Sequence, residues 1–162
     1  MIVVSDTSPI HYLLLINQVE LLPKLYGSIN IPEAVRDEML AAGAPVILQQ
    51  WIQQPPSWLN VYVVELPTNL ALMRLDPGER AAIQLALQIQ ADLLIVDDKP
   101  ARQAATALGI KITGLLGILS EAARLGEIEL PVVLAQLMNK TNFRASPKLI
   151  QMLLTHPDIG PS

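Results

Sequence analysis

The chain has 162 residues, enough for one domain with a hydrophobic core, and 51% of those residues are hydrophobic. It contains no cysteine, which excludes disulfides, thiolate nucleophiles and sulfur-ligated zinc. The formal net charge of −4 argues against a protein that coats nucleic acid by charge alone. No apolar run has membrane-spanning length and the chain does not open on an export signal, so we expect a cytoplasmic protein without membrane contact.

Short apolar strands alternate with helical patterns along the chain. The predicted strands are Ile2–Ser5, Ser28–Ile31, Val61–Glu65, Leu93–Val96 and Ile110–Thr113. The predicted helices cover residues 9–25, 32–42, 46–54, 77–90, 99–108, 115–125, 132–139 and 147–156. This alternation predicts an α/β fold with a parallel sheet covered by helices on both faces. We expect one domain over residues 1–162, with a core and site in residues 1–126 and C-terminal helices in residues 131–156.

Carboxylates follow directly after two of the apolar strands. Asp6 follows the first strand, and Asp97 and Asp98 follow the fourth. Ser8–Pro9 can cap and begin the helix after the first strand, so capping does not require Asp6. One of the two later aspartates is expected to cap the helix that follows it, which leaves the other available. Because ligands bind at the carboxyl ends of strands in a parallel sheet, these acids are candidate ligand-binding residues.

Two further carboxylates are predicted on helices. Glu38 shares the i, i+3, i+4 stripe of Val35 and Met39, which should face the core, where an acid needs a partner. Glu79 stands three residues after Asp76 in the spacing of a capping box, which explains it without any chemistry. Capping and ligand binding are nevertheless compatible, because a helix that starts at the strand ends presents its first turn there.

Carboxylates gathered in one place repel each other, so they need protons or cations to hold them together. The sequence therefore predicts a divalent metal site with oxygen ligands. The two histidines, His11 and His156, stand alone and are assigned no role. A rival interpretation is a phosphorylatable receiver domain, since Asp97–Asp98 followed by Arg102 imitates its acid pair. A receiver also needs an aspartate at the end of a later strand, and the only later aspartate is Asp158 near the chain end.

Four segments, in this order and spacing, resemble the PIN-domain nucleases, and within them a VapC-toxin-like branch. The segments are Val4–Ile10, Ile31–Met39, Leu75–Ala86 and Ala91–Arg102. The resemblance implies a three-layer α/β/α fold with a central parallel sheet, binding of Mg²⁺ or Mn²⁺, and cleavage of RNA. It also implies a cognate antitoxin that silences the enzyme.

Carried onto this chain, the resemblance implies a catalytic cluster of acids and a metal-binding set that overlaps it. The catalytic cluster is Asp6, Glu38, Glu79 and Asp98. The metal would be held by Asp6, Glu79 and either Asp97 or Asp98. The RNA backbone would be held by Arg80, Lys99 and Arg102, although solvated charges on helix faces explain these three equally well.

The chain departs from the family pattern in two places. Val96 stands where PIN nucleases commonly carry Thr or Ser, and Pro100 stands where many carry another acid. Binding of one metal ion and binding of two therefore both stay open. We expect a PIN-type metal-dependent endoribonuclease, the toxin of a toxin–antitoxin pair, which forms homodimers partly through the apolar segment Leu149–Leu154. The alternative is a catalytically silent PIN-like module that binds nucleic acid or protein.

Overall fold

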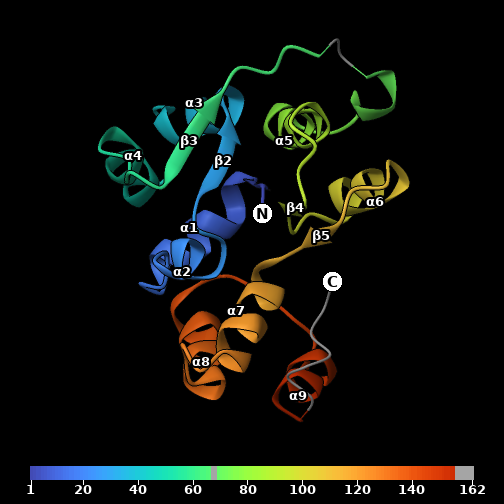
Figure 1. Cartoon of the computed structure of the whole chain (residues 1–162). Coiled ribbons are helices and arrows are strands. Elements are labelled where there is room, and N and C mark those ends of the chain that lie inside the picture. The colour runs from blue at the N-terminus through green and yellow to red at the C-terminus, as the bar shows by residue number, and fades with distance from the viewer. Residues whose placement is uncertain (67–68, 156–162) are drawn as a thin grey trace.

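The described part of the chain, residues 1–66 and 69–155 of the computed structural model, contains a five-stranded sheet in the order β3-β2-β1-β4-β5 (Figure 1). His156 and Asp158 lie outside the described residues. All strand pairs are parallel. The strands are β1 (Val3–Ser5), β2 (Ile29–Pro32), β3 (Leu59–Tyr62), β4 (Leu93–Ile95) and β5 (Ile112–Thr113).

Helices cover both faces of this sheet (Figure 1). Those before β4 are α1 (Thr7–Leu15), α2 (Leu21–Tyr26), α3 (Glu33–Leu40), α4 (Val46–Gln53), a short 3₁₀ helix η1 (Leu70–Leu72) and α5 (Pro77–Gln88). Those after β4 are α6 (Lys99–Ala107), α7 (Leu115–Arg124), α8 (Leu130–Lys140) and α9 (Pro147–Thr155). Within the described residues, no helix combines the length and the apolar character needed to cross a membrane.

Successive residues of the central strand face opposite sides of the sheet, and this divides the core in two. Val3 packs in a large cluster with residues of α1, α2, α7 and α8, while Val4 packs in a smaller one with residues of α5 and α6. Both valines are fully buried. The molecule is therefore a three-layer α/β/α structure, which confirms the fold class expected from the sequence.

The register of the central strands brings the predicted acids to one edge. β1 and β4 are neighbours, with Val3 opposite Leu93 and Ser5 opposite Ile95. The Asp6 backbone N–H donates to the Ile95 carbonyl at 3.0 Å, which continues the ladder to the end of the strand. Asp6 and the Asp97–Asp98 pair thus leave the sheet at the same carboxyl edge, where ligands bind in parallel sheets.

Residues 9–25 do not form the single helix that the sequence predicted. α1 ends at Leu15 and α2 begins at Leu21. Between them Asn17 has a φ of 56°, in the left-handed region that asparagine tolerates better than most residues. The apolar residues around the break continue the helical spacing, which is why the pattern did not reveal it.

The third strand is also displaced from its prediction. Val61–Glu65 was expected, whereas β3 covers Leu59–Tyr62. Its register follows from pairing with β2, which sets Ile29 opposite Leu59 and Pro32 opposite Tyr62. Because a period-two pattern fits both positions almost equally, only this pairing decides between them.

Candidate functional site

Asp6 is a buried carboxylate at the point where β1 passes into α1. Asp6 is 6% exposed. It occupies the N-cap position of α1, although its side chain makes no capping hydrogen bond. The helix begins at Thr7, so the expectation that Ser8 caps it is wrong. Burial raises the pKa of Asp6 to about 7, the nearby Glu38, Asp76 and Asp97 carboxylates add to this rise, and the Thr7 backbone amide opposes it. The Asp6 carboxylate is therefore not used for capping, and it lies among other acids.

Glu38 lies on α3 beside two buried residues of the predicted core stripe. Val35 and Met39 are fully buried, and the half-buried Glu38 accepts a hydrogen bond of 2.7 Å from the Thr7 hydroxyl to its Oε2. Its carboxylate also occupies the space where a side chain of Gly78 would begin, since a Cβ added there would overlap the carboxylate. Glu38 is thus held between the first turns of α1 and α5.

Glu79 lies in the first turn of α5, close to other acids. The predicted capping box is confirmed: the Glu79 N–H donates to Asp76 Oδ1 at 2.9 Å, and the Asp76 N–H donates to Glu79 Oε1 at 3.4 Å. Burial raises the pKa of Glu79 to about 8, with further contributions from the charges of Asp76 and Asp98, a side-chain hydrogen bond to Asp98, and the charge of Asp6. Burial and neighbouring negative charges both favour the protonated form of Glu79.

Asp98 and Asp97 have different surroundings although they are adjacent. Asp98 is exposed and takes the N-cap position of α6 without a side-chain capping bond. Asp97 turns toward α7, where its Oδ1 accepts the Leu115 N–H at 3.0 Å. Burial raises the pKa of Asp97, while the Leu115 hydrogen bond and the Arg102 charge oppose this. We refer to Asp6, Glu38, Glu79 and Asp98 as the acidic site; Asp97 lies at its border.

The donor chemistry of the acidic site suits a hard divalent cation, because every donor is a carboxylate oxygen. In residues 1–66 and 69–155, no three His, Cys, Asp or Glu side chains converge closely enough to hold a metal ion jointly. Mg²⁺ commonly binds through one or two carboxylates and keeps several waters, so a pair of carboxyls suffices for it. Glu79 and Asp98 form such a pair, because they lie close enough for the Asp98 charge to raise the pKa of Glu79.

The three basic residues predicted to hold RNA lie in different environments. Lys99 is exposed at the start of α6, and Arg80 is partly buried on α5 with its Nη1 3.9 Å from Met73 Sδ. Arg102 is partly buried and donates to the Val96 carbonyl at 2.8 Å, so it is not a purely solvated charge. Lys99 and Arg102 line a shallow groove of about 460 Å³ with Gln103 and Thr106.

Sequence reasoning missed three residues of the site. Thr7 positions Glu38, Gly78 leaves room for the Glu38 carboxylate, and Asp76 adds its charge to both Asp6 and Glu79. Gly78 could have been noticed in the sequence, because glycine has a low helix propensity and its presence in the first turn of a helix therefore needs a separate explanation. His11, which was assigned no role, is partly buried, and burial lowers its pKa.

A sequence profile described as PIN domain matches residues 2–157 of the chain, almost its whole length. No curated protein and no solved structure gives a significant match.

Proposed function

Because the chain belongs to the PIN-domain family, whose members are generally nucleases, we propose that it is a metal-dependent ribonuclease that works through the acidic site. The observation that carries the proposal is the gathering of Glu79, Asp98 and the buried Asp6 at one edge of the sheet, where the charges of Asp98 and Asp6 both act on Glu79. Acids that hold protons near neutral pH are typical of sites that exchange those protons for a cation.

Mg²⁺ or Mn²⁺ is the cation that this donor set would hold. Asp6, Glu79 and Asp98 would bind it directly or through water. The sequence left Asp97 and Asp98 as alternatives, and we choose Asp98 because its charge acts on Glu79, whereas Asp97 accepts the Leu115 N–H. When bound, such an ion polarises a phosphoryl oxygen and lowers the pKa of a coordinated water. Without it, crowded carboxylates repel an approaching phosphate.

The remaining residues of the site position its parts. The Thr7 hydroxyl fixes the Glu38 carboxylate, which leaves Glu38 able to orient a water or a ligand at the same edge. Lys99 begins α6 directly after Asp98, and Arg80 follows Glu79 in α5, so both offer positive charge beside these acids, where they would hold the RNA backbone together with Arg102. These contacts to phosphate orient the strand without reading its sequence.

We extend the proposal to the biological role on the resemblance alone: the ribonuclease is the toxin of a toxin–antitoxin pair and acts as a homodimer. A small neighbouring reading frame whose product binds this protein would support that role. Toxicity on induced expression, relieved by that product, would support it further.

A silent binding module is the competing function. The observation that favours it is that no three carboxylates of the described chain converge on one point. Metal affinity too weak for catalysis would follow from such spacing.

Cleavage of single-stranded RNA by the purified protein tests the proposal. We expect cleavage with Mg²⁺ or Mn²⁺, none with chelator, and a loss of about 100-fold or more for Glu79→Gln, because an amide lacks the charge that a hard cation requires. The matched control is Glu20→Gln, an exposed acid at the start of α2, which should cleave like the wild type. Equal cleavage by both variants, or none by the wild type with either metal, would contradict the proposal.

A further inference from the structure

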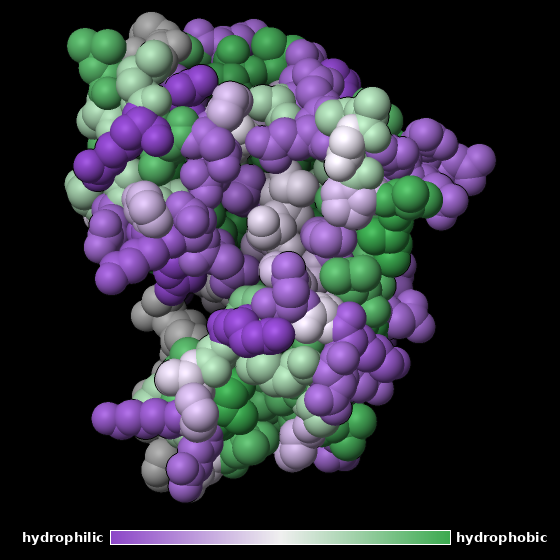
Figure 2. Space-filling view, turned by 180° about the vertical axis from the view of Figure 1, so that it is seen from behind, coloured by the Kyte–Doolittle hydropathy of each residue, from purple (hydrophilic) through white to green (hydrophobic). Residues whose placement is uncertain are grey.

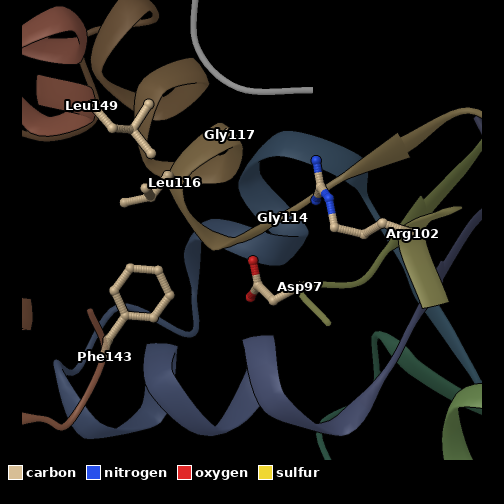
Figure 3. A pocket seen from close by; sticks show the side chains of 7 residues that line it. All are labelled: Asp97, Arg102, Gly114, Leu116, Gly117, Phe143 and Leu149. Carbon is tan, nitrogen blue, oxygen red and sulfur yellow. The ribbon is translucent and has the colours of Figure 1, made fainter. Parts of the chain in front are cut away.

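A small cavity lies at the border of the acidic site, between the carboxyl ends of β4 and β5 and the C-terminal helices (Figure 3). Its volume is about 220 Å³. Two charged side chains, three apolar ones and two glycines line it: Asp97, Arg102, Leu116, Phe143, Leu149, Gly114 and Gly117. The charge of Asp97 also acts on Asp6, so this cavity and the acidic site are neighbours.

Asp97 is fixed in position yet lacks one partner. The Leu115 N–H holds its Oδ1 at 3.0 Å, and the backbone of Gly114 approaches so closely that a Cβ there would overlap the carboxylate. Its Oδ2 is buried, and among the residues that the structure describes it has no hydrogen-bond partner. A buried acceptor without a donor is rare in native proteins, and a donor from water or from a ligand would complete it.

Phe143 supplies a fixed aromatic wall. It lies in the turn between α8 and α9, and this turn is tied to α1 because the Tyr12 hydroxyl donates to Asn142 Oδ1 at 2.7 Å. The Tyr12 and Phe143 rings pack edge to face with their centroids 5.3 Å apart. Figure 3 shows the Phe143 ring and the Asp97 carboxylate entering the same space from different segments of the chain.

We propose that this cavity binds a single nucleobase of the RNA, one that carries an exocyclic amino group, beside the phosphate held at the acidic site. The inference rests on the proposed ribonuclease function. The cavity is smaller than the roughly 300–1,000 Å³ of pockets for drug-sized ligands, which suits one ring system. Unpaired bases of RNA are commonly stacked on aromatic side chains and read along their edges, and Phe143 offers the stacking surface.

The unpartnered oxygen of Asp97 sets the preference among bases. A carboxylate only accepts hydrogen bonds, and the amino group of cytosine donates one at this edge. Uracil has a carbonyl oxygen in the same position, and its single ring N–H lies between two such oxygens, which repel a carboxylate. Cytosine should therefore bind better than uracil, and the two bases are close to identical in size and in stacking surface.

Binding of cytidine and uridine, measured by NMR titration in the presence of chelator, tests the inference without RNA cleavage. We expect cytidine to bind about tenfold more tightly than uridine, the scale of one well-placed edge contact. Asp97→Asn keeps an oxygen for the Leu115 N–H and turns the other atom into a donor, so its preference should move toward uridine. Phe143→Leu should weaken both nucleosides by about tenfold through lost stacking. Asp37→Asn, at an exposed acid of α3, should change nothing.

Equal binding of the two nucleosides, no binding of either, or an unchanged preference in Asp97→Asn would overturn the inference. The chelator separates this result from the proposed function. Base selection without metal-dependent cleavage would refute the ribonuclease alone, and cleavage without base selection would refute the pocket alone.

Discussion

Replacing Asp6 by asparagine removes a carboxylate whose ionised form the folded protein disfavours. The pKa of Asp6 rises from 3.8 to about 7, mainly through burial. Each pKa unit corresponds to about 1.4 kcal/mol, so ionised Asp6 lowers the free energy of unfolding by about 4 kcal/mol above pH 7. Asparagine keeps the size of the side chain without that charge. We therefore expect Asp6→Asn to be more stable than the wild type when metal is absent.

The gain should depend on pH with a definite sign. A raised pKa means that the folded state holds its proton while the unfolded state releases it, so stability falls as the pH rises from about 4 to about 7. Asparagine does not titrate, and the advantage of Asp6→Asn should be small at pH 4 and full at pH 8. For a domain of this size, roughly 2–4 °C per kcal/mol puts the increase in melting temperature on the order of 10 °C.

Thermal and urea unfolding in chelator, from pH 4 to pH 8, measures this difference. Asp37→Asn is the matched control, because its side chain is 64% exposed beside Arg36 and its replacement should shift the melting temperature little. A metal-free Asp6→Asn protein that is less stable than the wild type at pH 8 would refute the reasoning, since Asp6 would then be a structural residue.

Three further predictions concern metal, packing and assembly. Mn²⁺ should stabilise the wild type more at pH 8 than at pH 6, because the raised pKa of Glu79 makes protons compete with the metal, and thermal unfolding at both pH values measures this. Gly78→Ala should push the Glu38 carboxylate aside and cut RNA cleavage by up to about 100-fold while stability changes by at most about 1 kcal/mol, whereas Gly43→Ala, with open space around it, should leave cleavage intact. The protein should have the mass of a dimer in light scattering at micromolar concentration, because hydrophobic residues such as Met152 and Leu154 remain exposed and apolar patches interrupt a mostly hydrophilic surface (Figure 2); a monomeric mass would contradict this.

The sequence predicted the sheet and its acidic edge because the signals for them are local. Short, mostly apolar runs lead into aspartate at the ends of β1 and β4, and Asp76, Pro77 and Glu79 mark the start of α5 within four residues. Such patterns depend on the pleat of a strand or the first turn of a helix alone.

The parts that the sequence did not predict depend on residues far apart in the chain. Thr7 donates a hydrogen bond to Glu38, which lies 31 residues later in the chain. Glu38 on α3 also approaches Gly78 on α5 so closely that a Cβ there would overlap its carboxylate. The register of β3 is likewise set by β2 and not by its own pattern. Which of Asp97 and Asp98 turns toward Glu79 depends on the α7 backbone, through the Leu115 N–H. None of these contacts has a signal at a fixed sequence spacing.

Calorimetric titration of the wild-type protein with Mn²⁺, in two buffers that differ in their heat of ionisation, tests the central claim most directly. The claim is that the acidic site gives up protons to bind a divalent cation. Near pH 7 we predict binding with a net release of protons, since burial raises the pKa values of Asp6 and Glu79 to about 7 and about 8. The proton release should decrease in Glu79→Gln. Absence of Mn²⁺ binding, or binding without proton release, would contradict the account.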